Sequence, residues 1–254
     1  MRNKSLVIKI FIIIALTASA GYLLAAFVFF ADRNDKNICR QVNVRILNDK
    51  ELQMMSAKTV TDFVCKGSLN PTGKPIAEVK TDKIEEELLH ANPVVKSAEC
   101  YITPSGIMNI DILQRTPKFR VITGSEAYYV DTEGKTFPVS TDYSAYVPVV
   151  SGRLTKTFAT TQLFDFVNFI EKNGFWNAQI EQIYVVDNRN IELVQRIGGG
   201  IIRFGDIANY ELKFEKLQKL YTNAFKEIGW NHYRTIDLRL ADQTDMIVCT
   251  KINN

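Results

Sequence analysis

One long apolar run dominates the pattern of hydrophobic and polar positions in this chain. Residues 10–31 read IFIIIALTASAGYLLAAFVFFA, about 22 positions without a charged side chain. A helix needs roughly 20 apolar residues to cross the hydrocarbon core of a bilayer. The run has no polar face for solvent, which argues against a core helix of a soluble protein. We therefore expect residues 10–31 to form a transmembrane helix.

A cleaved secretory signal is the alternative interpretation of the same run. Ala18-Ser19-Ala20 has the small-x-small form of a cleavage site, and basic residues precede the run. Apolar residues continue well beyond this site, as far as Phe30, so cleavage would leave an exposed apolar tail on the mature protein. We favour a retained signal-anchor, and cleavage stays the alternative.

The flanking charges predict how the anchor is oriented. Arg2, Lys4 and Lys9 precede the run without an acidic residue, whereas the charges of residues 32–36 cancel. The positive-inside rule then puts residues 1–9 in the cytoplasm and the bulk of the chain outside, which in a bacterium is the periplasm. Residues 32–40 read as a linker.

Short elements follow over residues 41–117. Alternating polar and apolar residues predict strands at 42–46, 95–102 and 108–112. One predicted helix starts after Ser56, and a second starts at a capping box of Asp82 and Glu85. The expected inner residues of these helices are Val60, Phe63, Val64, Ile84, Leu88 and Leu89. The order strand, helix, helix, strand, strand indicates a small α+β domain.

Residues 118–254 read mainly as strands with helices between them. The expected helices run from Thr160 or Thr161 to Asn173, and from Tyr210 to Ile228. The expected strands are 118–123, 127–130, 136–139, 146–152, 180–186, 191–196, 201–204, 234–240 and 245–251. This pattern predicts a mixed β-sheet domain with flanking helices. The fold class of the whole chain is therefore α+β with one transmembrane helix.

Composition and charge narrow the function. The net charge of +3 and the pI near 8.5 are too mild to indicate nucleic-acid binding. The four cysteines lie far apart, without the paired spacing of a metal site. In an oxidising compartment they can form one or two disulfides, in three possible full pairings, or stay small buried apolar residues. The sequence leaves this choice open for Cys39, Cys65, Cys100 and Cys249.

Catalytic chemistry finds little support in the residues. Only His90 and His232 can act as imidazole bases, and each reads as a helix-end or surface residue. The HExxH, SxxK, GxSxG and P-loop motifs are absent. Gly198-Gly199-Gly200 leads into a predicted strand, so it lacks the helix N-terminus that binds phosphate. We expect no catalytic residue, metal, cofactor or small-molecule substrate.

Residues 41–117 carry landmarks that resemble a POTRA domain. A helix with Leu88 and Leu89 leads into Asn92-Pro93-Val94-Val95-Lys96-Ser97-Ala98. Gly106, Asn109-Ile110-Asp111-Ile112 and Gln114-Arg115-Thr116-Pro117 follow. The chemistry agrees with the resemblance, because Asn-Pro ends a helix and glycine permits a hairpin turn.

The rest of the chain is similar to the FtsQ/DivIB family. Tyr129-Val130-Asp131-Thr132-Glu133-Gly134-Lys135 and Val147-Pro148-Val149-Val150-Ser151-Gly152 resemble its "YD--G" and "P---G" landmarks. Ile202-Arg203-Phe204-Gly205, Glu215-Lys216-Leu217 and Ile236-Asp237-Leu238-Arg239 resemble later ones. Each piece is short, but their order after a signal-anchor and one POTRA-like domain is specific.

The resemblance implies a non-enzymatic, single-pass scaffold of the bacterial inner membrane. Proteins of this family bind FtsB/DivIC and FtsL at the division septum and help to recruit and control septal peptidoglycan synthesis. Their POTRA domain is tied to recruitment, and their last strands bind the partner through an exposed edge. The matching residues here are Thr235, Asp237, Arg239, Leu240, Met246, Ile247, Val248, Cys249 and Thr250.

Two alternatives remain for the function. The first is a POTRA-containing assembly or secretion factor of the outer-membrane type, although such factors usually carry several POTRA domains and a long β-barrel of repeated amphipathic strands. The second is a periplasmic binding module, released if the chain is cut after Ala20.

The closing strand of this chain departs from the resemblance in one respect. It has no aromatic residue, whereas some family members carry aromatic residues in that region.

Overall fold

The computed structural model of the protein describes residues 2–34, 37–140, 143–187, 189–197, 200–225, 227, 229, 233–241, 244 and 246–251. Its contacts divide the chain into two compact units. The first unit comprises Met1–Glu51 and Met55–Gln114, and the second comprises Leu52–Met54 and Arg115–Asn254. Each unit has a hydrophobic core of its own.

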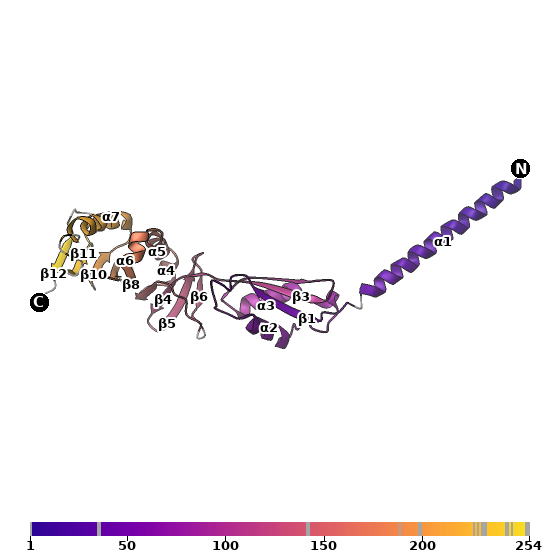
Figure 1. Ribbon diagram of the computed structural model, residues 1–254, viewed down its shortest axis with the longest axis horizontal. Coiled ribbons are helices and arrows are strands. Elements are labelled where there is room, and N and C mark those ends of the chain that lie inside the picture. The colour runs from indigo at the N-terminus through magenta and orange to yellow at the C-terminus, as the bar shows by residue number, and fades with distance from the viewer. Residues whose placement is uncertain are drawn as a thin grey trace. The chain divides into compact units, whose positions relative to one another are not determined.

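The predicted transmembrane segment lies within one long helix, α1 (Arg2–Asn34; Figure 1). Its stretch Phe11–Val28 has a mean hydropathy of 2.2, and none of these residues is buried inside the protein. Large side chains such as Phe11 and Phe27 are exposed. The helix is long and apolar enough to cross a membrane, and its exposed apolar side chains suit contact with lipid.

The rest of the first unit has the predicted order of strand, two helices and two strands (Figure 1). Its elements are β1 (Gln41–Ile46), α2 (Ala57–Lys66), the 3-10 turn η1 (Ile76–Glu78), α3 (Thr81–Ala91), β2 (Val95–Ile102) and β3 (Ile107–Gln114). The strands lie in the order β1-β3-β2, with β1 parallel and β2 antiparallel to β3.

The core of this unit lies between the two helices and one face of the sheet. Its buried members include Val60, Val64, Ile84, Leu88, Met108, Ile110 and Ile112. The opposite face of the sheet is polar, and Arg45 of β1 pairs there with Asp111 of β3 at 2.6 Å. The alternation of the strands therefore separates core from solvent as the sequence predicts.

The inner stripes of the two helices are narrower than predicted. Phe63 and Leu89 were expected inside, but they are 36% and 41% exposed. Each helix has two buried residues spaced by four, Val60 with Val64 and Ile84 with Leu88, and the partly buried Ala57 of α2 packs against the same core.

The predicted capping box of the second helix is also wrong. The helix α3 begins at Thr81, after Lys80, and its N-terminus has no side-chain cap. Glu85 instead accepts a hydrogen bond of 2.7 Å from the backbone N–H of Cys100 in β2. The carboxylate of Glu85, which the local motif predicts at the helix N-terminus, therefore makes a tertiary hydrogen bond instead.

In the described part of the second unit, nine strands form one mixed sheet (Figure 1). They are β4 (Pro117–Thr123), β5 (Glu126–Asp131), β6 (Thr136–Pro138), β7 (Val149–Gly152), β8 (Ile180–Asp187), β9 (Asn190–Gln195), β10 (Ile201–Gly205), β11 (Tyr233–Asp237) and β12 (Val248–Lys251). Their order is β12-β11-β10-β9-β8-β7-β4-β5-β6. Strand β7 runs parallel to β4 and β8, β10 runs parallel to β11, and the other neighbours are antiparallel.

Helices pack on one face of this sheet (Figure 1). They are α4 (Lys156–Thr160), α5 (Gln162–Lys172), α6 (Gly174–Gln179) and α7 (Tyr210–Leu220). The apolar residues that recur at helical spacing in α5 are all buried: Leu163, Phe166, Val167 and Ile170. Aromatic rings join the helices to the sheet, with Phe214 of α7 lying 4.7 Å from Trp176 of α6 and 5.0 Å from Phe204 of β10 between ring centroids.

The helices α4 and α6 were not predicted. Asn173 was expected to end a helix, and it does follow α5, but its side chain also accepts hydrogen bonds from the N–H groups of Phe175 and Trp176. It therefore starts α6 as an N-cap. The predicted helix over 210–228 changes form part-way: α7 ends at Leu220 and a π-helical turn, η2 (Tyr221–Phe225), follows it directly, and residue 228 lies outside the described residues.

Candidate functional site

The strand β12 forms one end of the large sheet. It pairs antiparallel with β11, with Thr235 opposite Thr250 and Asp237 opposite Val248. Within the described part of the chain, no strand lies on its other side. The backbone N–H and C=O groups on that side are therefore available to a strand from another protein.

One face of β12 holds the strand against the core. Cys249 lies opposite the buried Ile236, and it packs against the hydrophobic core together with Ile247. Burial raises the pKa of the Cys249 thiol, which keeps it neutral. This face positions the strand.

Three exposed apolar side chains lie on β12 or in the connection before it. Val248 is 59% exposed, and Met246 and Leu240, which precede the strand, are 65% and 57% exposed. Beside Val248, Asp237 accepts hydrogen bonds from Arg239, at 2.6 Å from Nη2 to Oδ2 and 2.9 Å from Nε to Oδ1. These bonds hold the pKa of the Asp237 carboxyl below its usual range. Exposed apolar side chains beside a fixed arginine are typical of a protein-binding surface.

The predicted partner-binding residues do not all lie at the edge. Thr235 and Asp237 lie in β11, Arg239 and Leu240 in the turn after it, Met246 and Ile247 before β12, and Val248, Cys249 and Thr250 in β12. The strand β11 is paired on both sides, in parallel with β10 and antiparallel with β12. The two closing strands are therefore not both edge strands: β11 is an inner strand, and β12, as far as the described residues go, is the edge. Partner binding by these residues stays a prediction.

The opposite end of the sheet has a different character. The strand β6 is three residues long, contains Pro138 and, among the described residues, pairs with β5 alone. Proline has no N–H to offer, and a short edge presents few groups to a partner. Of the two ends of the sheet, β12 is therefore better suited to strand addition.

Two family matches account for nearly all of the chain beyond α1. Residues 37–113 match the POTRA-like domain, and residues 116–250 match the family described as FtsQ/DivIB, C-terminal related. The second match covers more than half of the chain and includes the β11–β12 edge. The chain belongs to the FtsQ/DivIB family. Its domains are those of a cell-division protein. The proteins of the FtsQ/DivIB family are non-catalytic scaffolds of cell division. No curated protein matches the chain.

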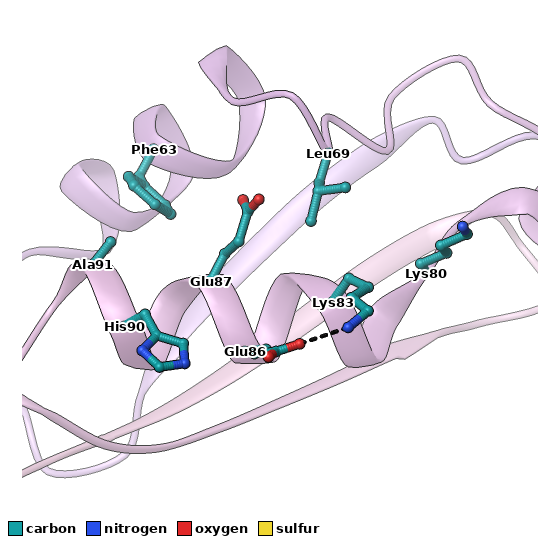
Figure 2. A pocket seen from close by; sticks show the side chains of 8 residues that line it. All are labelled: Phe63, Leu69, Lys80, Lys83, Glu86, Glu87, His90 and Ala91. Atoms are coloured by element: carbon teal, nitrogen blue, oxygen red, sulfur yellow. Dashed lines mark hydrogen bonds and ion pairs between the residues drawn. The ribbon is translucent and has the colours of Figure 1, made fainter.

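A groove runs between α2 and α3 in the POTRA-like domain (Figure 2). Its volume is about 730 Å³, and its lining consists of Phe63, Leu69, Lys80, Lys83, Glu86, Glu87, His90 and Ala91. Figure 2 shows the Glu87 carboxylate directed into the space between the helices, while Lys83 and Glu86 pair with each other at 2.8 Å. His90 lies on the rim of this groove, and the described lining places no serine or cysteine nucleophile beside it.

The other candidate chemical groups of this FtsQ/DivIB chain are dispersed. His232 lies outside the described residues. In the described part of the chain, no three His, Cys, Asp or Glu side chains gather as a metal site. The four cysteines, all of them described, are free thiols. Burial, with a smaller effect from Glu85, raises the pKa of Cys100 to about 12.

Two lysines of α7 make tertiary contacts that lie outside the motifs recognised in the sequence. Lys213 is buried, and its Nζ donates to the carbonyl oxygens of Phe204 (3.1 Å) and Asp206 (2.9 Å). It lies four residues before the buried Leu217, so helical spacing could have placed it on the inner face. Lys216 donates to two carbonyl oxygens of the β11–β12 connection, and no sequence spacing indicates contacts so distant along the chain.

Proposed function

We propose that this FtsQ/DivIB-family chain is a bitopic scaffold of the bacterial divisome. The helix α1 anchors it in the inner membrane, with residues 1–9 in the cytoplasm and the two soluble units in the periplasm at the division septum. Its C-terminal unit binds FtsB/DivIC-like and FtsL-like proteins. Through them it helps to recruit and control septal peptidoglycan synthesis, without catalysis of its own.

The free edge of β12 is the observation that carries this proposal. Among the described residues no strand pairs with the outer side of β12, and Leu240, Met246 and Val248 on or near it have exposed apolar side chains. A partner strand would add a tenth strand to the sheet, gaining main-chain hydrogen bonds along its length and burying these side chains. The family assignment supports a division protein as that partner.

The anchor part of the proposal rests on length and charge. The Phe11–Val28 stretch of α1 meets the length and hydropathy of a membrane span. The basic residues Arg2, Lys4 and Lys9 precede it, which favours a cytoplasmic N-terminus.

Val248→Pro tests the binding edge. Proline removes a backbone donor and disrupts strand pairing, so we expect capture of the FtsB/DivIC-type protein from the same organism to fall at least about tenfold. Thr136→Pro, at the opposite edge of the same sheet, is the matched control and should leave capture unchanged. Circular dichroism and the melting temperature establish that both variants are folded. Equal capture by wild type and a folded Val248→Pro variant would move the interface elsewhere.

The intact mass of the protein in fractionated cells tests the anchor. A retained anchor gives the full-length mass in the inner-membrane fraction. A soluble periplasmic species starting near Gly21 would contradict the anchor and favour a released binding module.

A further inference from the structure

Lys216 joins two parts of the C-terminal unit that are distant in sequence. It lies on α7, between the buried Phe214 and Leu217, and its Nζ donates to the carbonyl oxygens of Ala241 (2.6 Å) and Thr244 (3.0 Å). Both acceptors belong to the connection between β11 and β12. The ammonium group of Lys216 therefore links the segment that precedes the edge strand β12 to helix α7, which packs in the core.

The connection itself is shaped to present these carbonyls. Its described part forms a turn in which the Ala241 N–H donates to Leu238 O at 3.0 Å, and the Thr244 N–H donates to Leu240 O at 2.9 Å. Ala241 is fully buried, so this end of the turn is packed as well as bonded. The carbonyl oxygens of Ala241 and Thr244 both accept hydrogen bonds from the Nζ of Lys216.

The strand that follows, β12, has few contacts of its own. Among the described residues, β12 has a single neighbouring strand, and its four paired positions include a register irregularity near Tyr233. Val248, Thr250 and Lys251 have mostly exposed side chains, so they add little packing. An edge strand of this kind frays easily unless its ends are held. Charge-assisted hydrogen bonds from a lysine are among the stronger polar contacts available to hold one.

We propose that Lys216 is a positioning residue that orders β12 for its partner. The effect of Lys216 on partner binding rests on the proposed function. The effect of Lys216 on the order of β12 does not depend on any partner. A strand that is already ordered loses less conformational entropy when another strand is added to it. The lysine of the Glu215-Lys216-Leu217 landmark thus acts at the binding edge without touching the partner.

The test compares variants of the full-length protein in detergent. Lys216→Met keeps the length of the side chain and removes its charge, and Lys216→Arg keeps a donor. Lys219→Met is the matched control, because Lys219 lies one turn along α7 and pairs with Glu215 on the exposed face at 2.7 Å. Amide hydrogen exchange over residues 246–251 reports the order of β12. Exchange over β9 and α7 reports the core.

We expect Lys216→Met to speed exchange in β12 and to weaken capture of the FtsB/DivIC-type protein, each by about tenfold, because only the ordered fraction binds. Exchange in β9 should be unchanged, Lys216→Arg should recover part of both effects, and Lys219→Met should match wild type. Unchanged β12 exchange in Lys216→Met overturns the inference, as does general destabilisation that includes β9. Faster β12 exchange with full binding overturns the positioning role. If wild type itself binds no partner, the proposed function fails while the exchange result still decides the role of Lys216 in ordering the strand.

Discussion

Replacing Gly152 with alanine is expected to destabilise the C-terminal unit severely. Gly152 ends β7 at φ +118°, a backbone conformation that residues with a side chain rarely adopt. A Cβ built there would collide with the carbonyl oxygen of Val185 in β8, and would lie 2.8 Å and 2.9 Å from its carbonyl carbon and backbone nitrogen. This glycine therefore lets two parallel strands approach each other at the centre of the sheet.

The size of the effect follows from three contributions. The positive φ, which lies outside the left-handed helical region, costs about 1–3 kcal/mol for a residue with a Cβ. Forcing an extra methyl group into a packed site costs typically about 1–3 kcal/mol. The strands must separate to relieve the collision, which weakens the 2.7 Å hydrogen bond from Arg153 N–H to Val185 O and costs about 1 kcal/mol more. The total of about 3–7 kcal/mol is a large part of the stability of a typical domain, about 5–15 kcal/mol.

Gly124→Ala is the matched control for this prediction. Gly124 also has a positive φ, +56°, but a Cβ there meets nothing within 4 Å. The control therefore has the conformational cost without the collision, and the effect of alanine on the unfolded chain is the same in both variants.

Urea unfolding of the full-length protein in detergent gives the measurement. Tryptophan fluorescence reports on the C-terminal unit, because both tryptophans, Trp176 and Trp230, belong to it. The free energy of unfolding should fall by at least about 2 kcal/mol more for Gly152→Ala than for Gly124→Ala, from the collision and hydrogen-bond contributions. Equal effects of the two substitutions would refute the steric reasoning.

Two further predictions concern titration and reactivity. Because Arg239 lowers the pKa of Asp237, the stabilisation that Asp237 provides is present above the unfolded pKa of about 3.9 and is lost as the pH falls through the folded value. The melting temperature of Asp237→Asn should therefore lie below that of wild type at pH 7, and the gap should narrow as the pH falls below about 3.9, whereas a gap of constant size would contradict this ion pair. Because the pKa of Cys100 is raised to about 12, its thiol should react far more slowly with iodoacetamide at pH 8 in the folded protein than in urea. Peptide mapping measures the rate, and rapid labelling of Cys100 in the folded protein would show that its burial is wrong.

Local chemistry predicted elements well where the signal lay within one element. The alternation of β3 placed Met108, Ile110 and Ile112 in the core, and the helical spacing of α5 placed Phe166 and Ile170 there. Both patterns work because one face of the element meets the core and the other meets solvent.

Local chemistry failed where a distant partner competed for the same group. Glu85 fits a capping box by sequence, but a strand N–H at Cys100 takes its carboxylate. Asn173 is a different case, because both of its roles are local: it ends α5, and its side chain also caps the helix that follows. Such groups can bond in more than one way, and the tertiary environment selects among them.

By itself, the sequence determined the apolar helix, the β-α-α-β-β order of the POTRA-like domain and the strand-rich C-terminal unit, because each follows from hydrophobic period over neighbouring residues. Only the tertiary structure decided that β11 is an inner strand and β12 the edge, since strand order depends on pairings such as that of Ile202 with Ile236 across α7. It also decided that Lys216 reaches the β11–β12 connection. Contacts between residues far apart in the chain leave no periodic trace in the sequence, and the candidate binding edge is built from such contacts.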